Sequence, residues 1–185
     1  MKARMAFVEK HFGRGAWDRV LAVLPVDDVR GIQGVLTPAS WFPFEIAERL
    51  DKAIVEVLGG GKPEIFEQIG AQSARENLEG IHRPFLQPGN PKKFLERAGM
   101  VYAFYYDTGR REYQSVGPQE GVLTTHDAET FSAGDCLTVI GWYKEALRMC
   151  GADHVEMRET ECRARGDAVC RYRIRWTLLG GKGPA

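Results

Sequence analysis

The chain has 185 residues, which is enough for one domain with a hydrophobic core or for two small ones. Its 25 Lys and Arg residues balance 25 Asp and Glu residues, and this balance argues against nucleic acid or an anionic membrane surface as a partner. No apolar run is long enough to span a membrane, and the charged N-terminal residues lack the apolar segment of a signal peptide. We therefore expect a cytoplasmic protein whose four cysteines are free, metal-bound or catalytic rather than paired in disulfides.

Apolar residues at helical spacing predict four helices in the first two thirds of the chain. The predicted ranges are 17–24, 41–58, 63–80 and 91–108. Pro25 ends the first helix, Ser40 is a suitable N-cap for the second, and Gly109 ends the fourth.

The pattern then changes to alternating residues that favour strands. Residues 111–117 and 121–127 predict two strands, 133–149 an amphipathic helix, and 153–163 with 168–177 an antiparallel hairpin. No repeat or linker divides the chain. We predict an α+β fold, with a helical N-terminal half packed on an antiparallel sheet, as one domain over 15–177. Residues 1–14 are then an N-terminal extension or helix, and 178–185 a flexible tail.

Two of the cysteines lie in this terminal hairpin, in "ETECRARGDAVC". A three-residue turn at 165–167 places Cys162 opposite Cys170, with Cβ atoms roughly 4.5–5.5 Å apart. This separation suits two thiolates on one zinc ion. Glu159 has the wrong strand parity to join them unless the strand contains a bulge.

A third thiol comes from the helix over 133–149. Cys136 lies in its first turn, where the free N–H groups favour a thiolate. Three thiolates and the Glu159 carboxylate would complete a closed, tetrahedral structural zinc site. Cys150 is about 21 Å from Cys136 along the same helix, so one ion cannot bind both. The residues alone leave other interpretations open: buried core thiols, a disulfide or a redox pair.

The helix start "GDC" and the Glu-x-x-Cys-x7-Cys spacing, followed by "RYRIRW", resemble the V4R (4-vinyl reductase) domain. The segments "WFPFEIAERLDKAIVEVLGGG", "AFYYDTGR" and "IGWYKEALRMCGADHVEMRE" are similar to a group of myxobacterial proteins related to that domain. The resemblance covers residues 15–177. It implies the α+β ligand-binding fold that V4R domains share with haem-NO-binding sensors and Golgi-transport subunits.

The resemblance also implies a set of site residues. In phenol-sensing relatives a cysteine at a helix start and the Glu-x-x-Cys-x7-Cys set hold zinc, and these positions fall on Cys136, Glu159, Cys162 and Cys170. The haem-binding branch needs a proximal histidine on a helix and a Tyr-x-Ser-x-Arg motif. His82 is the histidine in a helical neighbourhood, but "YQSVG" has Gly117 where the motif has arginine, so no haem is expected.

Aromatic side chains with polar tips suit a mostly apolar ligand pocket. The candidate pocket residues are Tyr102, Tyr105, Tyr106, Tyr113 and Trp142. We therefore expect a non-catalytic, small-molecule-sensing regulatory domain with a structural zinc ion. Its ligand would be small and hydrophobic or aromatic, and its partner a second copy in a homodimer or a regulatory protein. The alternatives are a protein–protein interaction module like the transport-complex subunits, a haem-based gas sensor and a reductase-type enzyme.

Overall fold

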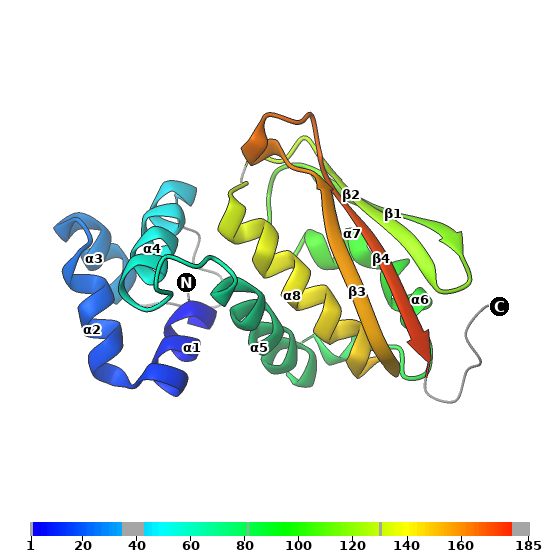
Figure 1. Ribbon diagram of the computed structural model, residues 1–185, viewed down its shortest axis with the longest axis horizontal. Helices are drawn as coiled ribbons and strands as arrows, with labels where there is room; N and C mark the ends of the chain where they lie inside the picture. The colour runs from blue at the N-terminus through cyan, green and yellow to red at the C-terminus, as the bar shows by residue number, and fades with distance from the viewer. Residues whose placement is uncertain (1, 35–42, 81, 130, 179–185) are drawn as a thin grey trace.

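The computed structural model describes residues 2–34, 43–80, 82–129 and 131–178. Five helices form its N-terminal part: α1 (Lys2–Phe12), α2 (Arg14–Ala22), α3 (Val26–Gln33), α4 (Phe44–Val57) and α5 (Ile65–Glu79). They surround their own apolar core, in which Phe7, Val20, Leu50 and Ile54 are buried. Helix α2 packs on α1 and α4, and α1 packs on α5, so these helices lie away from the sheet (Figure 1).

The C-terminal part combines shorter helices with a four-stranded sheet. Its elements are η1 (Arg83–Phe85), α6 (Pro91–Leu95), α7 (Ala98–Tyr102), β1 (Arg110–Gly117), β2 (Glu120–His126), α8 (Ala133–Met149), β3 (Ala152–Glu161), η2 (Arg163–Arg165) and β4 (Cys170–Leu178). The strand order is β1-β2-β4-β3, and every neighbouring pair is antiparallel. Strand β4 alternates between buried Tyr172, Ile174 and Trp176 and exposed arginines, so one face of the sheet packs on α8 and α7 while the other meets solvent.

The mixed helical and antiparallel architecture predicted from the sequence is confirmed, and the helix predicted over 133–149 is α8. Ser40, the predicted cap of the second helix, lies outside the described residues. The helix predicted over 91–108 is instead two short helices, α6 and α7. The break at residues 96–97 lets α7 pack against β1, and Gly99 permits this contact, because a Cβ there would lie 2.9 Å from the carbonyl oxygen of Arg111. None of the described helices is both long and apolar enough to cross a membrane.

Helix α8 is the element that joins the two parts, because it packs closely on α5 along its length. Two glycines permit this contact. A Cβ at Gly70 of α5 would overlap the backbone of Thr138, and a Cβ at Gly141 of α8 would overlap the backbone of Glu67. Backbone atoms of packed helices cannot move aside as a flexible side chain can, so both positions require glycine.

We expect Gly141→Ala to destabilise the protein by about 2 kcal/mol or more, despite the higher helix propensity of alanine, because the helices must separate. Gly31→Ala in α3 is the matched control, since nothing lies within 4 Å of its Cβ position. The control variant should gain up to about 1 kcal/mol. Denaturant unfolding of both variants measures the difference, and equal stabilities would contradict the close α5–α8 contact.

Candidate metal centre

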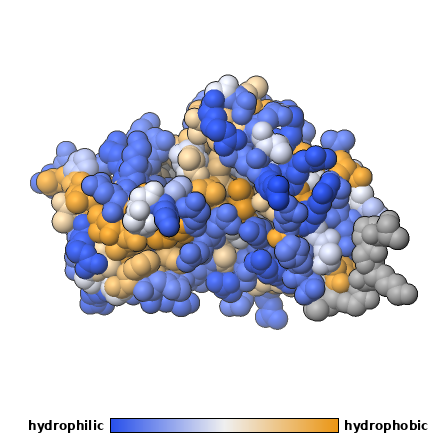
Figure 2. All heavy atoms as spheres, in the orientation of Figure 1, coloured by the Kyte–Doolittle hydropathy of each residue, from blue (hydrophilic) through white to orange (hydrophobic). Residues whose placement is uncertain are grey.

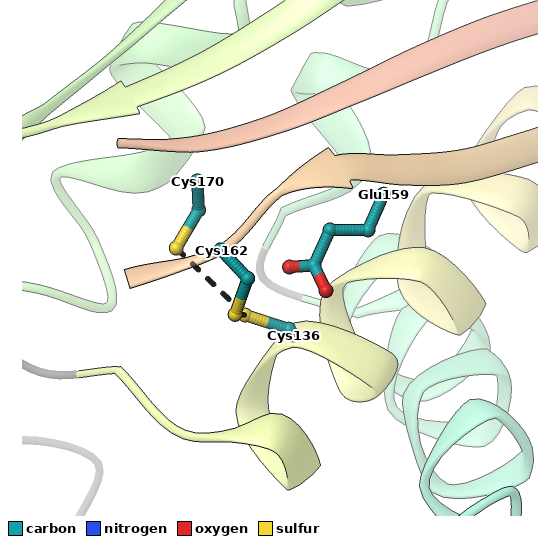
Figure 3. A group of neighbouring side chains, drawn as sticks. All are labelled: Cys136, Glu159, Cys162 and Cys170. Atoms are coloured by element: carbon teal, nitrogen blue, oxygen red, sulfur yellow. Dashed lines mark hydrogen bonds between the residues drawn. The ribbon is translucent and has the colours of Figure 1, made fainter. Parts of the chain in front are cut away.

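Three cysteines and one glutamate meet where α8 begins and the terminal hairpin turns (Figure 3). Cys136 lies in the first turn of α8, and Glu159 lies near the end of β3. Cys162 directly follows β3, and Cys170 begins β4. The Cys136 sulfur is 3.6 Å from that of Cys162 and 3.8 Å from that of Cys170. One ligand atom from each of the four residues lies within 4.8 Å of all the others.

These separations match a tetrahedral metal site. Zinc–sulfur bonds of about 2.3 Å at tetrahedral angles place two ligand sulfurs about 3.8 Å apart. A disulfide requires sulfurs about 2.05 Å apart, so the cysteines are free thiols in this structure. The structure therefore brings together all four residues that the sequence singles out as metal ligands.

A β-bulge turns Glu159 toward the cysteines. Glu159 pairs with Tyr172 and Glu161 with Arg171, so Thr160 is the extra residue on β3. Without it, the odd spacing from Glu159 to Cys162 would place the two side chains on opposite faces. The loop also differs from the predicted three-residue turn: it is the 3₁₀ turn η2 followed by Gly166, whose φ of 96° requires glycine.

The two oxygens of Glu159 have different surroundings. Oε2 accepts a hydrogen bond of 2.7 Å from Arg165. Oε1 is buried beside the sulfurs and has no hydrogen-bond partner among the described residues. A buried carboxylate oxygen without a partner is costly, and a cation at the centre of the four ligand atoms would satisfy it.

Protonation of the thiols follows from their contacts. Hydrogen bonding from Cys136, helped by the backbone N–H of Arg163 at 3.4 Å, lowers the pKa of Cys170 to about 6. The same hydrogen bond, together with burial, raises the pKa of Cys136, and burial raises the pKa of Cys162. Without metal, these contacts favour ionisation of Cys170 over Cys136, whereas the helix N-terminus predicted Cys136. A divalent cation would favour ionisation of all three.

The hairpin loop is held by contacts next to the ligands. The carboxylate of Asp167 accepts a hydrogen bond of 2.7 Å from the backbone N–H of Cys162. Arg163 places its guanidinium 4.8 Å from the centre of the Phe131 ring. These contacts fix the positions of Cys162 and Cys170 before any ion binds, as outer residues do in many metal sites.

The five predicted pocket residues lie in three different surroundings in the structure. Tyr102 and Tyr106 stack with ring centres 4.6 Å apart, and both line a cavity of about 10 Å³ beside Cys136 and Cys170, with room for about one water molecule. Tyr105 and Trp142 meet edge to face in a separate aromatic cluster. Tyr113 lies elsewhere. Its ring covers Gly121 so closely that a Cβ at Gly121 would overlap the ring.

Three residues near the centre were missed by the sequence analysis. Buried Arg111 and half-buried Asp135 line the same small cavity, and Asp135 accepts hydrogen bonds of 2.8 and 3.0 Å from the Tyr106 hydroxyl. The third residue, Arg165, donates a hydrogen bond to Glu159. Strand parity could have identified the first, because Arg111 has the same parity as Tyr113 in β1 and so points inward.

The model of the protein family DUF2378, described as a protein of unknown function, matches residues 83–177. This segment is just over half of the chain. The chain belongs to the DUF2378 family. All four candidate ligands lie in the matched segment. No functionally curated protein matches this DUF2378 protein.

Solved structures similar to the DUF2378 protein are H-NOX domains. An Fe(II) unliganded H-NOX protein from K. algicida is 9% identical, with a TM-score of 0.72, and the match covers 98% of this chain and 97% of that one. An H-NOX structure used to probe haem distortion is 13% identical, with a TM-score of 0.69 and coverage of 99% and 96%. An oxygen complex of an H-NOX domain related to soluble guanylate cyclases is 14% identical, with a TM-score of 0.66 and coverage of 100% and 97%. These similarities show an H-NOX-like fold.

Two predictions from the sequence are corrected by these comparisons. The resemblance to the V4R domain is wrong: the family match is to DUF2378, and the structural neighbours are H-NOX domains. A short ligand spacing is a local feature, and it does not distinguish between families that share a fold. The expectation that haem plays no part is also contradicted, because the neighbours of the same fold are haem proteins.

The residues around His82 meet one requirement of a haem site and not another. The His82 side chain is buried, and burial lowers its pKa, so its imidazole is neutral and can act as an axial ligand. The rings of Phe104 and Tyr105 lie 5.0 and 5.6 Å from it, and the cavity near Cys136 is not lined by His82. A pocket for a cofactor of this size takes several hundred Å³. The imidazole of His82 could therefore bind haem iron. A haem group would fit beside it only if the rings of Phe104 and Tyr105 moved away.

We expect Cys162→Ala to abolish metal binding and to lower the melting temperature by roughly 10 °C, the effect of losing a tightly bound ligand in a domain of this size. Cys150→Ala is the matched control: this cysteine is equally buried but lies at the other end of α8. Thermal unfolding and elemental analysis of both variants test this. If the two variants melt alike and retain equal metal, the cluster is ordinary core packing.

Proposed function

We propose that this DUF2378 protein is a ligand-responsive sensing domain with a structural zinc ion. Cys136, Glu159, Cys162 and Cys170 hold the ion, which ties the start of α8 to the terminal hairpin. The H-NOX-like fold supports a sensing role, because it is a ligand-binding fold. Four protein ligands leave no open position on a tetrahedral ion, and this favours a structural over a catalytic metal.

The observation that carries the zinc proposal is the orphaned Oε1 of Glu159 facing three sulfurs at tetrahedral spacing. Thiols packed only as core side chains do not require a buried carboxylate oxygen to point at them. Zinc prefers such a sulfur-rich set with one carboxylate, whereas calcium and magnesium prefer oxygen ligands.

The ligand is proposed to be a small hydrophobic or aromatic molecule bound at the aromatic cluster of His82, Phe85, Phe104, Tyr105 and Trp142. Two buried polar atoms next to this cluster, Nε1 of Trp142 and the hydroxyl of Tyr143, have no hydrogen-bond partner among the described residues. A ligand with a hydrogen-bond acceptor would satisfy one of them. Because both residues belong to α8, binding there would act directly on the helix that the metal holds.

The response would pass to a second copy or to a regulatory protein. Figure 2 shows apolar surface over the N-terminal helices, whose exposed apolar side chains include Phe12, Val23 and Val26. Contiguous apolar surface of this kind is typical of interaction sites. No catalytic role is proposed for the chain.

Native mass spectrometry with elemental analysis of the purified protein tests the proposal. We expect one zinc per chain, which is lost when the protein is unfolded with a chelator. The same spectra report the oligomeric state and any ligand retained through purification. A protein that folds fully without metal, and takes up none when zinc is added, would contradict the proposal.

Haem-dependent sensing is the second candidate, favoured by the fold and by the neutral, buried imidazole of His82. When bound, haem would supply an iron position for a gaseous ligand. Phe104 and Tyr105 are 58% and 38% exposed, so they can swing outward to admit it at limited cost. Addition of haem should then produce an absorption band that is lost in His82→Ala and kept in His154→Ala, whose histidine is exposed. An unchanged haem spectrum would eliminate this candidate.

A further inference from the structure

We propose that Arg111 is the counter-charge of the metal centre, a positioning residue that stabilises the thiolate ligands without touching the ion. The inference rests on the zinc site proposed above. It assigns a role to a buried cation that the fold alone does not explain.

Arg111 is a buried arginine on β1 that lacks a charged partner in contact. Its residue is 8% exposed, and its Nε donates a hydrogen bond of 2.9 Å to Oγ1 of Thr125. The guanidinium lies over the rings of Tyr102 and Tyr143, 4.9 and 5.5 Å from their centres. In the part of the chain that the structure describes, it forms no ion pair with a carboxylate. A buried charge left in this state is strongly destabilising unless another charge compensates it.

The sheet register brings Arg111 toward the cysteines. Arg111 is opposite Thr125 on β2, and Thr125 is opposite Cys170 on β4. The three residues form one row across the buried face, with the Cα atoms of Arg111 and Cys170 about 10 Å apart at the usual strand spacing. The long side chain of Arg111 reaches over Thr125, so that Arg111, Cys136 and Cys170 line the same small cavity.

The charge of the loaded centre explains why a buried cation belongs there. A divalent ion with three thiolates and one carboxylate carries two excess negative charges. Arg165 lies on the solvent side, where it contacts Glu159 and is 56% exposed, so water weakens its effect. Arg111 faces the centre from the interior, where the effective dielectric constant is lower and each charge acts more strongly.

Asp135 is the other charged group at this cavity, but among the described residues its carboxylate forms no hydrogen bond or ion pair with Arg111. Its carboxylate accepts two hydrogen bonds from Tyr106. It also lies close enough to Arg4 and Arg111 to be affected by both charges. Arg111 also contacts Tyr102 of α7 and Tyr143 of α8, so this one side chain lies between the proposed metal centre and both helices.

The test is the zinc affinity of folded full-length protein, measured by competition with a chromophoric chelator. Arg111→Gln keeps a donor for Thr125 but removes the charge, and we expect it to bind zinc about tenfold more weakly or worse, the loss expected for one charge several ångströms away. Arg111→Lys keeps the charge and should bind within about threefold of the parent. Arg110→Gln is the control, because Arg110 is exposed on the same strand and pairs with Glu112 at 3.1 Å; its affinity should not change.

Each outcome decides the proposal. Equal affinities for the Gln and Lys variants would overturn it, as would an Arg111→Lys protein that fails to fold. Failure of Arg111→Gln to fold even in excess zinc would make Arg111 a structural core residue and would also overturn it. If the parent protein binds no zinc, the proposed function itself fails. If the parent binds one zinc and the variants match it, only the role of Arg111 fails.

Discussion

The convergence of three thiols and a carboxylate oxygen at one buried point is the constraint on which the C-terminal part of the protein depends. The ligands come from positions 26 and 34 residues apart in sequence, so no local preference brings them together. Buried polar atoms without partners oppose folding, whereas the same atoms around a divalent cation contribute binding energy to it. The centre can therefore hold the front of α8 against the hairpin more firmly than the small sheet alone.

Helix α8 carries this constraint through the molecule. Its first turn holds Cys136, a candidate metal ligand, and its middle carries Trp142 and Tyr143 next to the aromatic cluster. Its glycine contact fixes α5 and, through α5, the N-terminal core. A ligand that moves α8 therefore acts on both the metal centre and the N-terminal core. Coupling of this kind needs no long pathway, since one rigid helix touches every part involved.

The sequence predicted the parts of this arrangement that follow from spacing and missed those that depend on tertiary contacts. The amphipathic pattern over 133–149 predicted α8, and strand alternation with a Gly-Asp turn predicted the hairpin that brings Cys162 near Cys170. The spacing of the ligands required a β-bulge to turn Glu159 toward the cysteines, but it did not place the bulge at Thr160. A bulge leaves a residue unpaired in the sheet, and only tertiary contacts determine where that is tolerated. The close approach of Gly99 to β1 is a tertiary contact that helical spacing does not reveal. The inward parity of Arg111 could be read from β1, but its place beside the cysteines depends on how β1, β2 and β4 pair.

X-ray absorption at the zinc edge tests the central claim most directly. The account predicts three sulfur neighbours at about 2.3 Å and one oxygen neighbour at about 2.0–2.2 Å. Replacement of Glu159 by glutamine should remove or lengthen only the oxygen component. A zinc ion surrounded by nitrogen or oxygen alone, or cysteines joined to each other in a protein that binds no metal, would contradict it.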